Sequence, residues 1–170
     1  MNELPESTPK SAFAPVVAPH TRVLVLGSLP GEASLRAARY YAHPQNQFWR
    51  LIGDVIGRDV AALDYDARLA ALLAAGIGLW DSVARARRAG SLDTAIREVE
   101  AAPLAELAAT LPALRAVGFN GGTSARIGRR QFAPNSPLAF VQLASSSPAY
   151  CRVTWQEKQE SWNALRKFLR

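Results

Sequence analysis

Short apolar runs alternate with helical patterns along the chain, and this alternation constrains the fold more than any other feature of the sequence. Four runs have the length and apolar content of buried strands, and they span residues 21–27, 77–80, 115–119 and 138–143. Strands that alternate with helices usually form a parallel sheet that helices cover on both faces. We therefore predict an α/β fold with three layers, α/β/α, around a central, mostly parallel sheet of four strands.

Helical patterns fill the intervals between these runs. Apolar side chains recur at helical spacing from Phe48 to Ile56, and Gly57 follows as a stop signal. Asp64 can cap a further helix that Gly76 ends. We predict helices over residues 32–39, 45–57, 64–76, 91–100, 103–110, 122–130 and 154–169.

The chain has the length of one domain, at 170 residues. Its composition, 49% hydrophobic and 20% charged residues, is sufficient for a hydrophobic core. The first 20 residues hold Pro5, Pro9, Pro15 and Pro19 among small and polar residues. We predict a flexible leader over residues 1–20 and a single domain over residues 21–170.

Cys151 is the only cysteine, which excludes a disulfide framework, a cysteine-rich zinc module and an iron–sulfur cluster. The sequence shows no other cluster of metal ligands. We therefore expect neither a metal nor another cofactor, and we expect activity to survive EDTA.

The net charge of +6 favours a polyanionic partner such as nucleic acid. Most of the cationic residues are arginines, which suit phosphate oxygens, although genome base composition alone can produce the same bias. No apolar run approaches the roughly 20 residues of a membrane span, and the polar start does not resemble a secretory signal. We expect a cytoplasmic protein that does not contact a membrane.

The loops after the predicted strands could carry chemistry, because ligands of such sheets bind at the carboxyl ends of the strands. The first loop, Gly27–Gly31, reads GSLPG, and its backbone could approach a ligand or phosphate closely. It lacks the pattern of a P-loop and of a dinucleotide fingerprint. A purely structural turn therefore stays open here.

Residues 40–49 read YYAHPQNQFW and hold four aromatic side chains, one histidine and three amides. Tyr40 and Tyr41 precede a proline in a loop, where a ring face can stack on a flat ligand or a base. Phe48 and Trp49 begin the amphipathic helix, which favours a place for both side chains in the core. Asn46 lies near the helix start and could be an ordinary cap.

The loop over residues 143–150 reads LASSSPAY and follows the last predicted strand. Its hydroxyl and backbone N–H groups could hold a phosphodiester. A polar connector is the alternative.

Taken in their order along the chain, these segments resemble the motifs of the uracil-DNA glycosylase superfamily. The resembling segments are GSLPG, YYAHPQNQFW, WDSV, GSLD, FNGG and SSSPA. Within the superfamily, the sequence is most similar to the hypoxanthine-DNA glycosylases, or family 6, over about residues 21–169. The resemblance implies the fold of that superfamily and the removal of a deaminated base, hypoxanthine, from double-stranded DNA during base excision repair.

One departure from related families concerns the position of the catalytic asparagine. The mismatch-specific uracil and thymine glycosylases share AHPxNxFW, but their first loop reads GINPG, with a catalytic asparagine where this chain has Leu29. A leucine cannot hold water. The resemblance to family 6 instead implies Asn46 as the catalytic residue. No histidine follows His43, so the imidazole of the HPS loop in other families is absent.

The resemblance also implies roles for the other motif residues. Tyr41 is expected to stack on the flipped base, with Phe48 as a second aromatic wall or as core support. Asp81 could contact the base edge or cap the segment that follows it. The expected base-binding residues are Ser28, Leu29, Pro30, Gly31, Tyr41, Phe48, Asp81 and Asn120. The expected DNA contacts are Ser145, Ser146, Ser147, Pro148, Tyr150 and Arg152, with Arg126, Arg129 and Arg130 as further phosphate candidates.

Strand cleavage by a glycosylase requires an amine nucleophile. The three lysines, Lys10, Lys158 and Lys167, lie outside every motif. We therefore predict hydrolysis without lyase activity, by a monomer associated with the nucleoid.

Three alternatives stay open at this stage. The shared AHPxNxFW segment also fits a glycosylase that removes uracil from G·U mismatches. Leu29 and the absence of the HPS-loop histidine make a non-catalytic DNA-binding module conceivable. A general α/β small-molecule enzyme is the remaining alternative, although the sequence offers no phosphate loop or nucleophile–histidine pair for it.

Overall fold

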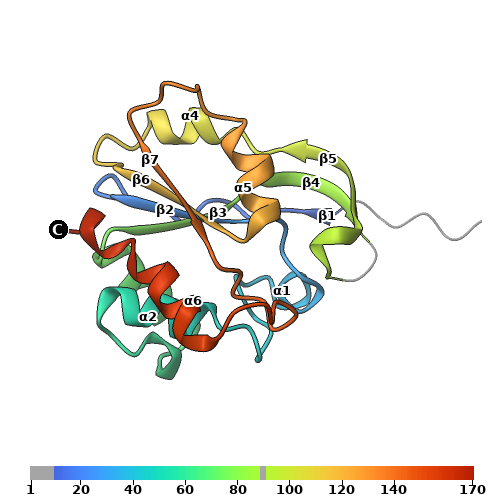
Figure 1. Cartoon of the computed structure of the whole chain (residues 1–170), viewed down its shortest axis with the longest axis horizontal. Helices are drawn as coiled ribbons and strands as arrows, with labels where there is room; N and C mark the ends of the chain where they lie inside the picture. Colours follow the sequence, from blue (N-terminus) through green and yellow to red (C-terminus); the bar gives the residue numbers. More distant parts are fainter. Residues whose placement is uncertain (1–9, 89–90) are drawn as a thin grey trace, which may run out of the picture.

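A computed structural model of the chain describes residues 10–88 and 91–170 (Figure 1). Its centre is a sheet of four strands in the order β3-β2-β6-β7, and all three neighbouring pairs are parallel. The strands are β2 (Val23–Gly27), β3 (Ile77–Asp81), β6 (Ala116–Asn120) and β7 (Ala139–Leu143). The predicted fold class is confirmed, and each strand begins and ends within two residues of its predicted bounds.

Strand β2 lies in the middle of the molecule and is buried on both faces. Val23 and Val25 pack into one hydrophobic cluster, whereas Leu24 and Leu26 pack into another. Alternate side chains of a strand point to opposite faces. A continuous apolar run at this position therefore supplies both cores of a sheet with helices on its two faces.

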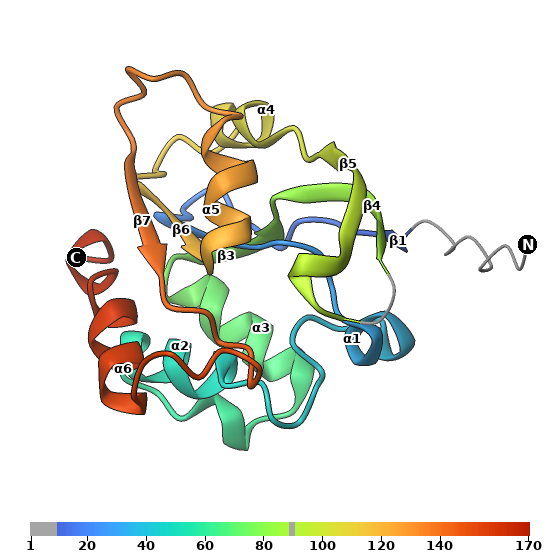
Figure 2. The same ribbon diagram turned by 45° about the vertical axis from the view of Figure 1, so that its right-hand side comes forward.

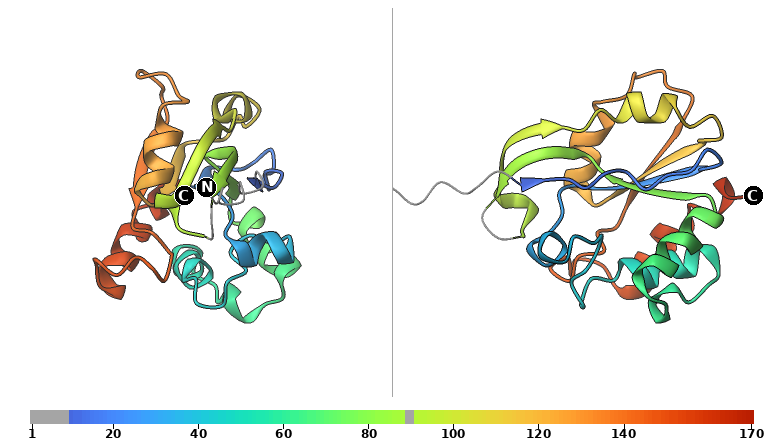
Figure 3. Two further views of the ribbon diagram at one scale, coloured as in Figure 1. Left: turned by 90° about the vertical axis from the view of Figure 1, so that its right-hand side faces the viewer. Right: turned by 180° about the vertical axis from the view of Figure 1, so that it is seen from behind.

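Helices form a layer on each side of the sheet (Figures 1 and 3). One layer holds α2 (Phe48–Ile56), α3 (Tyr65–Ala74) and α6 (Trp155–Asn163), and the other holds α4 (Leu104–Ala109) and α5 (Gly122–Arg129). The other helical elements are short: α1 (Glu32–Ala37) and the 3-10 turns η1 (Val60–Ala62), η2 (Asp93–Ala95) and η3 (Arg166–Phe168). The predicted last helix ends early, and η3 follows it.

The helix predicted over residues 91–100 is wrong. Strand β5 (Ile96–Ala101) pairs antiparallel with β4 (Val83–Arg88), and β1 (Lys10–Ser11) pairs with the other edge of β4. Arginines occupy several positions of β4, so the sequence lacks the apolar run that would predict a strand there. Pairing between β4 and β5 overrides the helix propensity of residues 96–101.

The segment expected to be a flexible leader is part of the fold from residue 10 onward. Val16 exchanges backbone hydrogen bonds with Leu79 of β3, and the ring of Phe13 lies edge-on to Tyr40 at 5.2 Å between centroids. Residues 1–9 of that predicted leader lie outside the described residues. Within the described ranges, no helix has the length and apolar character needed to cross a membrane.

Candidate active site

The carboxyl ends of the parallel strands open into a cavity of about 750 Å³. The loops after β2, β6 and β7 line it, together with the end of β3, the segment between α1 and α2, and residues 91–93. That segment and the chain after β7 lie side by side in Figure 2, where Gln47 N–H donates to the carbonyl of Ser146 over 3.0 Å. The predicted site residues that line the cavity are Ser28, Leu29, Pro30, Gly31, Tyr41, Asn46, Asp81, Asn120, Ser145, Ser146, Ser147, Pro148, Tyr150 and Arg152.

Asn46 presents its amide to this cavity in a fixed orientation. Its Oδ1 accepts hydrogen bonds from the Phe48 N–H, at 2.9 Å, and from the Ser146 hydroxyl, at 2.8 Å. Among the described residues, none accepts a hydrogen bond from the Nδ2 amino group. Because both lone pairs of the oxygen are engaged, the amino group is the part left for a ligand or a water. It can donate to a water oxygen but cannot take a proton.

Ser146 and Asn120 connect Asn46 to Tyr41. The Ser146 N–H donates to Asn120 Oδ1, and Asn120 Nδ2 donates to the Ser146 hydroxyl, both over 2.9 Å. The same Nδ2 lies 3.4 Å from the Tyr41 hydroxyl. Asn120 was expected to bind the base; in the structure most of its hydrogen-bonding capacity serves to fix its neighbours.

Tyr41 stacks on Phe48, with 3.8 Å between ring centroids and 15° between ring planes. Phe48 is fully buried and does not line the cavity, so the structure favours its alternative role as core support. Tyr41 has a left-handed backbone with φ of 51°, which is uncommon for a side chain of this size. A Cβ on Gly27 would lie only 3.2 Å from the Tyr41 hydroxyl, so the glycine leaves room for the ring. Phe48 covers one face of the ring at the cavity wall.

Asp81 ends β3 and is 3% exposed. Its Oδ2 has no hydrogen-bond partner in the described part of the chain. Burial raises the pKa of Asp81 to about 7; Asp93 adds to the increase, and Arg88 opposes it. The alternative role as a cap is not observed, because Ser82 N–H donates to the carbonyl of Gly27 and a strand follows. A buried carboxyl without a partner is costly, and such groups gather at functional sites.

The GSLPG loop is held from behind by Arg88 of β4. The buried guanidinium donates to the carbonyls of Leu29 and Pro30. Since the carbonyls face Arg88, backbone N–H groups of this loop remain for a ligand; proline has none, so Ser28, Leu29 and Gly31 supply them. The Leu29 side chain packs into a small apolar cluster with β4.

Sequence reasoning missed the contributions of Arg88 and Lys158. Lys158 is 3% exposed, and its Nζ donates to Gln47 Oε1 at 2.8 Å and to the carbonyl of Ser147 at 3.4 Å. Burial lowers its pKa. A lysine near the start of a helix opposes the helix dipole, and this was the available signal that Lys158 binds something other than solvent.

The candidate phosphate contacts differ in position, and Arg130 is exposed but does not line the cavity. Arg126 and Arg152 are exposed and line the cavity. Arg129 instead packs over the ring of Phe140, at 4.0 Å, and donates to carbonyls after α5. Among the described residues, no group of three or more His, Cys, Asp or Glu side chains could hold a metal ion.

The sequence matches a family model described as the uracil DNA glycosylase superfamily over residues 14–168. A protein of Methanosarcina barkeri named hypoxanthine DNA glycosylase is 44% identical over 115 residues, which cover 68% of this chain and 73% of that protein. A protein of the same name from Methanosarcina acetivorans is 39% identical over 112 residues, which cover 66% of this chain and 71% of that protein.

A solved structure also resembles this fold. It is the solution NMR structure of a Methanosarcina acetivorans protein provisionally named a uracil DNA glycosylase. The two structures have a TM-score of 0.84 and 32% sequence identity, and the match covers 95% of this chain and 99% of that chain.

Proposed function

The chain belongs to the uracil-DNA glycosylase superfamily and is a DNA glycosylase, and we propose that it hydrolyses the N-glycosidic bond of deoxyinosine in duplex DNA. The names of the two relatives support hypoxanthine as the base that is released. Uracil in a G·U mismatch is the second candidate; the name given to the protein with the similar solved structure supports uracil as the base.

The observation that carries the proposal is the orientation of Asn46 at the cavity. A base within a duplex must be flipped into a pocket before its glycosidic bond can be reached. With Oδ1 engaged by Phe48 and Ser146, the Nδ2 amino group can hold a water at the sugar. An amide is not a general base, so the barrier falls mainly through electrostatic stabilisation of the separating charges.

Tyr41 and Asp81 would bind the flipped base. The ring of Tyr41 stacks on the base while Phe48 fixes it from behind. Deamination of adenine gives hypoxanthine a ring N–H where adenine has a bare nitrogen. An ionised Asp81 accepts a hydrogen bond from that N–H, and its carboxylate repels the lone pair of the adenine nitrogen. Asp81 thus reads a group that deamination creates in hypoxanthine and in uracil alike.

The surrounding loops would bind the leaving base and the DNA backbone. Backbone N–H groups of the GSLPG loop are available to an oxygen of the departing base anion. Ser145, Ser146, Ser147, Pro148, Tyr150 and Arg152 line the cavity on the β7 side and would contact the backbone beside the lesion.

The test is base release under single-turnover conditions from duplexes that carry hypoxanthine, uracil, xanthine or a thymine mismatch. We expect release of hypoxanthine to be fastest, and release of uracil alone would favour the second candidate. Asn46→Ala should release base at least about 100-fold more slowly. Asn46→Asp is the matched variant, because its carboxylate can keep both hydrogen bonds of Oδ1 but lacks the amino donor; an active Asn46→Asp would contradict the role of Nδ2. No release by the unaltered protein at high enzyme concentration would favour the DNA-binding module.

The monomeric state and the association with the nucleoid stay proposals. The net charge of +6 supports association with DNA. Light scattering of the purified protein, with and without a short duplex, tests the monomer; a dimer that persists on dilution would contradict it.

A further inference from the structure

We propose that Leu92, at the tip of the β4–β5 hairpin, inserts into duplex DNA beside the lesion and fills the space that the flipped nucleotide leaves. The inference rests on the proposed function, because only a base-flipping protein creates such a space. It assigns a DNA contact to a segment for which the sequence predicted a helix.

The tip of the hairpin forms part of the cavity wall. Ser91, Leu92 and Asp93 line the cavity opened by the parallel strands, and Ser91 contacts Glu32 at the start of α1. Leu92 is 58% exposed, whereas the other large exposed hydrophobic residue of the described chain, Val99 at 44%, does not line the cavity. An apolar side chain that is mostly exposed at the cavity gains little from packing in the free protein.

Two side-chain contacts fix the tip on either side of Leu92. The Ser91 hydroxyl accepts a hydrogen bond from the backbone N–H of Glu32 at 2.9 Å. Asp93 Oδ1 accepts one from the Ser28 hydroxyl at 2.6 Å. The Leu92 carbonyl also accepts from the Ala95 N–H at 3.0 Å. The backbone is therefore held against the GSLPG loop while the side chain stays exposed, as an inserting residue requires.

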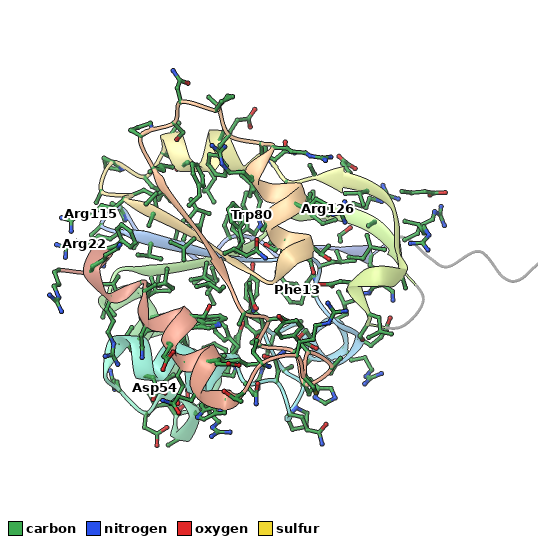
Figure 4. All side chains as sticks on the ribbon, viewed as in Figure 1. Phe13, Arg22, Asp54, Trp80, Arg115 and Arg126 are labelled. Atoms are coloured by element: carbon green, nitrogen blue, oxygen red, sulfur yellow. The ribbon has the colours of Figure 1, made fainter. Side chains whose placement is uncertain are left out.

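A basic side chain lies on the same side of the cavity. Arg126 lines the cavity, and Figure 4 places it where α5 faces the strands β4 and β5. Arg22 and Arg115 lie at the opposite edge of the molecule, where they donate to C-terminal carbonyls. A phosphate bound by Arg126 would bring the DNA backbone toward the hairpin tip.

Loss of base stacking explains why an apolar side chain would be useful at this point. Extruding a nucleotide leaves two base pairs without a stacking partner, and apolar side chains inserted at such steps offset part of that cost. Tyr150 follows β7, and β6 separates β7 from β2 in the sheet. Leu92 adjoins Asp93, which contacts Ser28 after β2, and Tyr150 lies after β7, so both residues line the cavity from different loops.

The test uses a duplex with a tetrahydrofuran abasic site next to 2-aminopurine, whose fluorescence rises when it is unstacked. We expect the unaltered protein to bind this duplex and raise the fluorescence. Leu92→Ala should bind about 10- to 100-fold more weakly, which corresponds to the loss of a buried leucine side chain. Leu92→Met should restore most of the affinity, and Val99→Ala, the matched control, should bind like the unaltered protein.

Two outcomes would overturn the inference. One is a Leu92→Ala protein that binds within about 2-fold of the unaltered protein and raises the fluorescence equally, since burial of leucine predicts a larger effect. The other is an unaltered protein that does not bind the abasic duplex. The abasic duplex holds no base to release, so a failure of hypoxanthine release would refute the proposed function and leave this measurement valid. Leu92 is exposed, so unfolding of the alanine variant is not expected, and its thermal melt checks this.

Discussion

Replacing Asp81 with asparagine tests whether this carboxyl is buried without a partner. The pKa rises from 3.8 to about 7 in the folded chain, because burial disfavours the charged form. The folded state therefore binds the proton more tightly than the unfolded state. A difference of about 3 pKa units corresponds to about 4 kcal/mol of unfolding free energy. This contribution is fully present below pH 4 and is lost as the pH rises toward about 7.

The Asp81→Asn variant has no proton to lose, so its stability should fall less as the pH rises. We expect the unfolding free energy of the variant, relative to the unaltered protein, to increase by about 4 kcal/mol between about pH 4 and about pH 8. A buried amide that lacks a partner would lower stability at both pH values equally, so only the difference between them is used. Unfolding of both proteins in guanidinium chloride at the two pH values measures this difference.

The same variant tests the role of Asp81 in reading the base. If the ionised carboxyl accepts the ring N–H, discrimination of hypoxanthine from adenine should improve in the unaltered protein as the pH rises through about 7, because a protonated carboxyl can also donate to the adenine nitrogen. The variant should lose this dependence on pH. Asp59→Asn, which changes an exposed carboxylate outside the cavity, is the matched control. A relative stability that does not change with pH would refute the reasoning about Asp81.

Three further outcomes are expected. Ser146→Ala removes the hydroxyl that connects Asn120 to Asn46, so base release should slow by about 10-fold and unfolding free energy should fall by about 1–3 kcal/mol; unchanged single-turnover rates would argue against the connection. Arg152→Ala should reduce the slope of log affinity against log salt concentration by about 1, as titrations with a labelled duplex measure, and an unchanged slope would remove Arg152 from the phosphate contacts. The protein should not cleave an abasic strand at neutral pH, with or without EDTA, because the Lys158 amine is bound to Gln47 and Ser147; borohydride trapping of a covalent complex with DNA would contradict this.

The sequence predicted the part of the site that stands directly on the parallel strands. Asp81, Asn120 and Ser146 lie at or after the ends of apolar runs, and the carboxyl ends of parallel strands meet at one edge of a sheet. The aromatic and amide-rich segment that holds Tyr41 and Asn46 was found from its composition and its resemblance to the superfamily.

The parts that could not be predicted depend on contacts between distant segments. A strand such as β4, with arginines among its alternating residues, lacks the periodic apolar signal, and the burial of Arg88 becomes favourable only when the GSLPG loop supplies two carbonyls. The sequence allowed Phe48 to be either a second aromatic wall for the base or a core residue. The packing of Tyr41 over its ring shows that it is a core residue.

The hydrogen bond between Asn46 and Ser146 joins residues 100 positions apart in the chain. During synthesis the Asn46 amide is therefore made long before its partner Ser146. A chain that stops short of β7 keeps Asn46 but lacks the part of the cavity wall that residues 145–152 supply. Copies truncated before residue 146 therefore lack the hydroxyl that orients the Asn46 amide at the cavity.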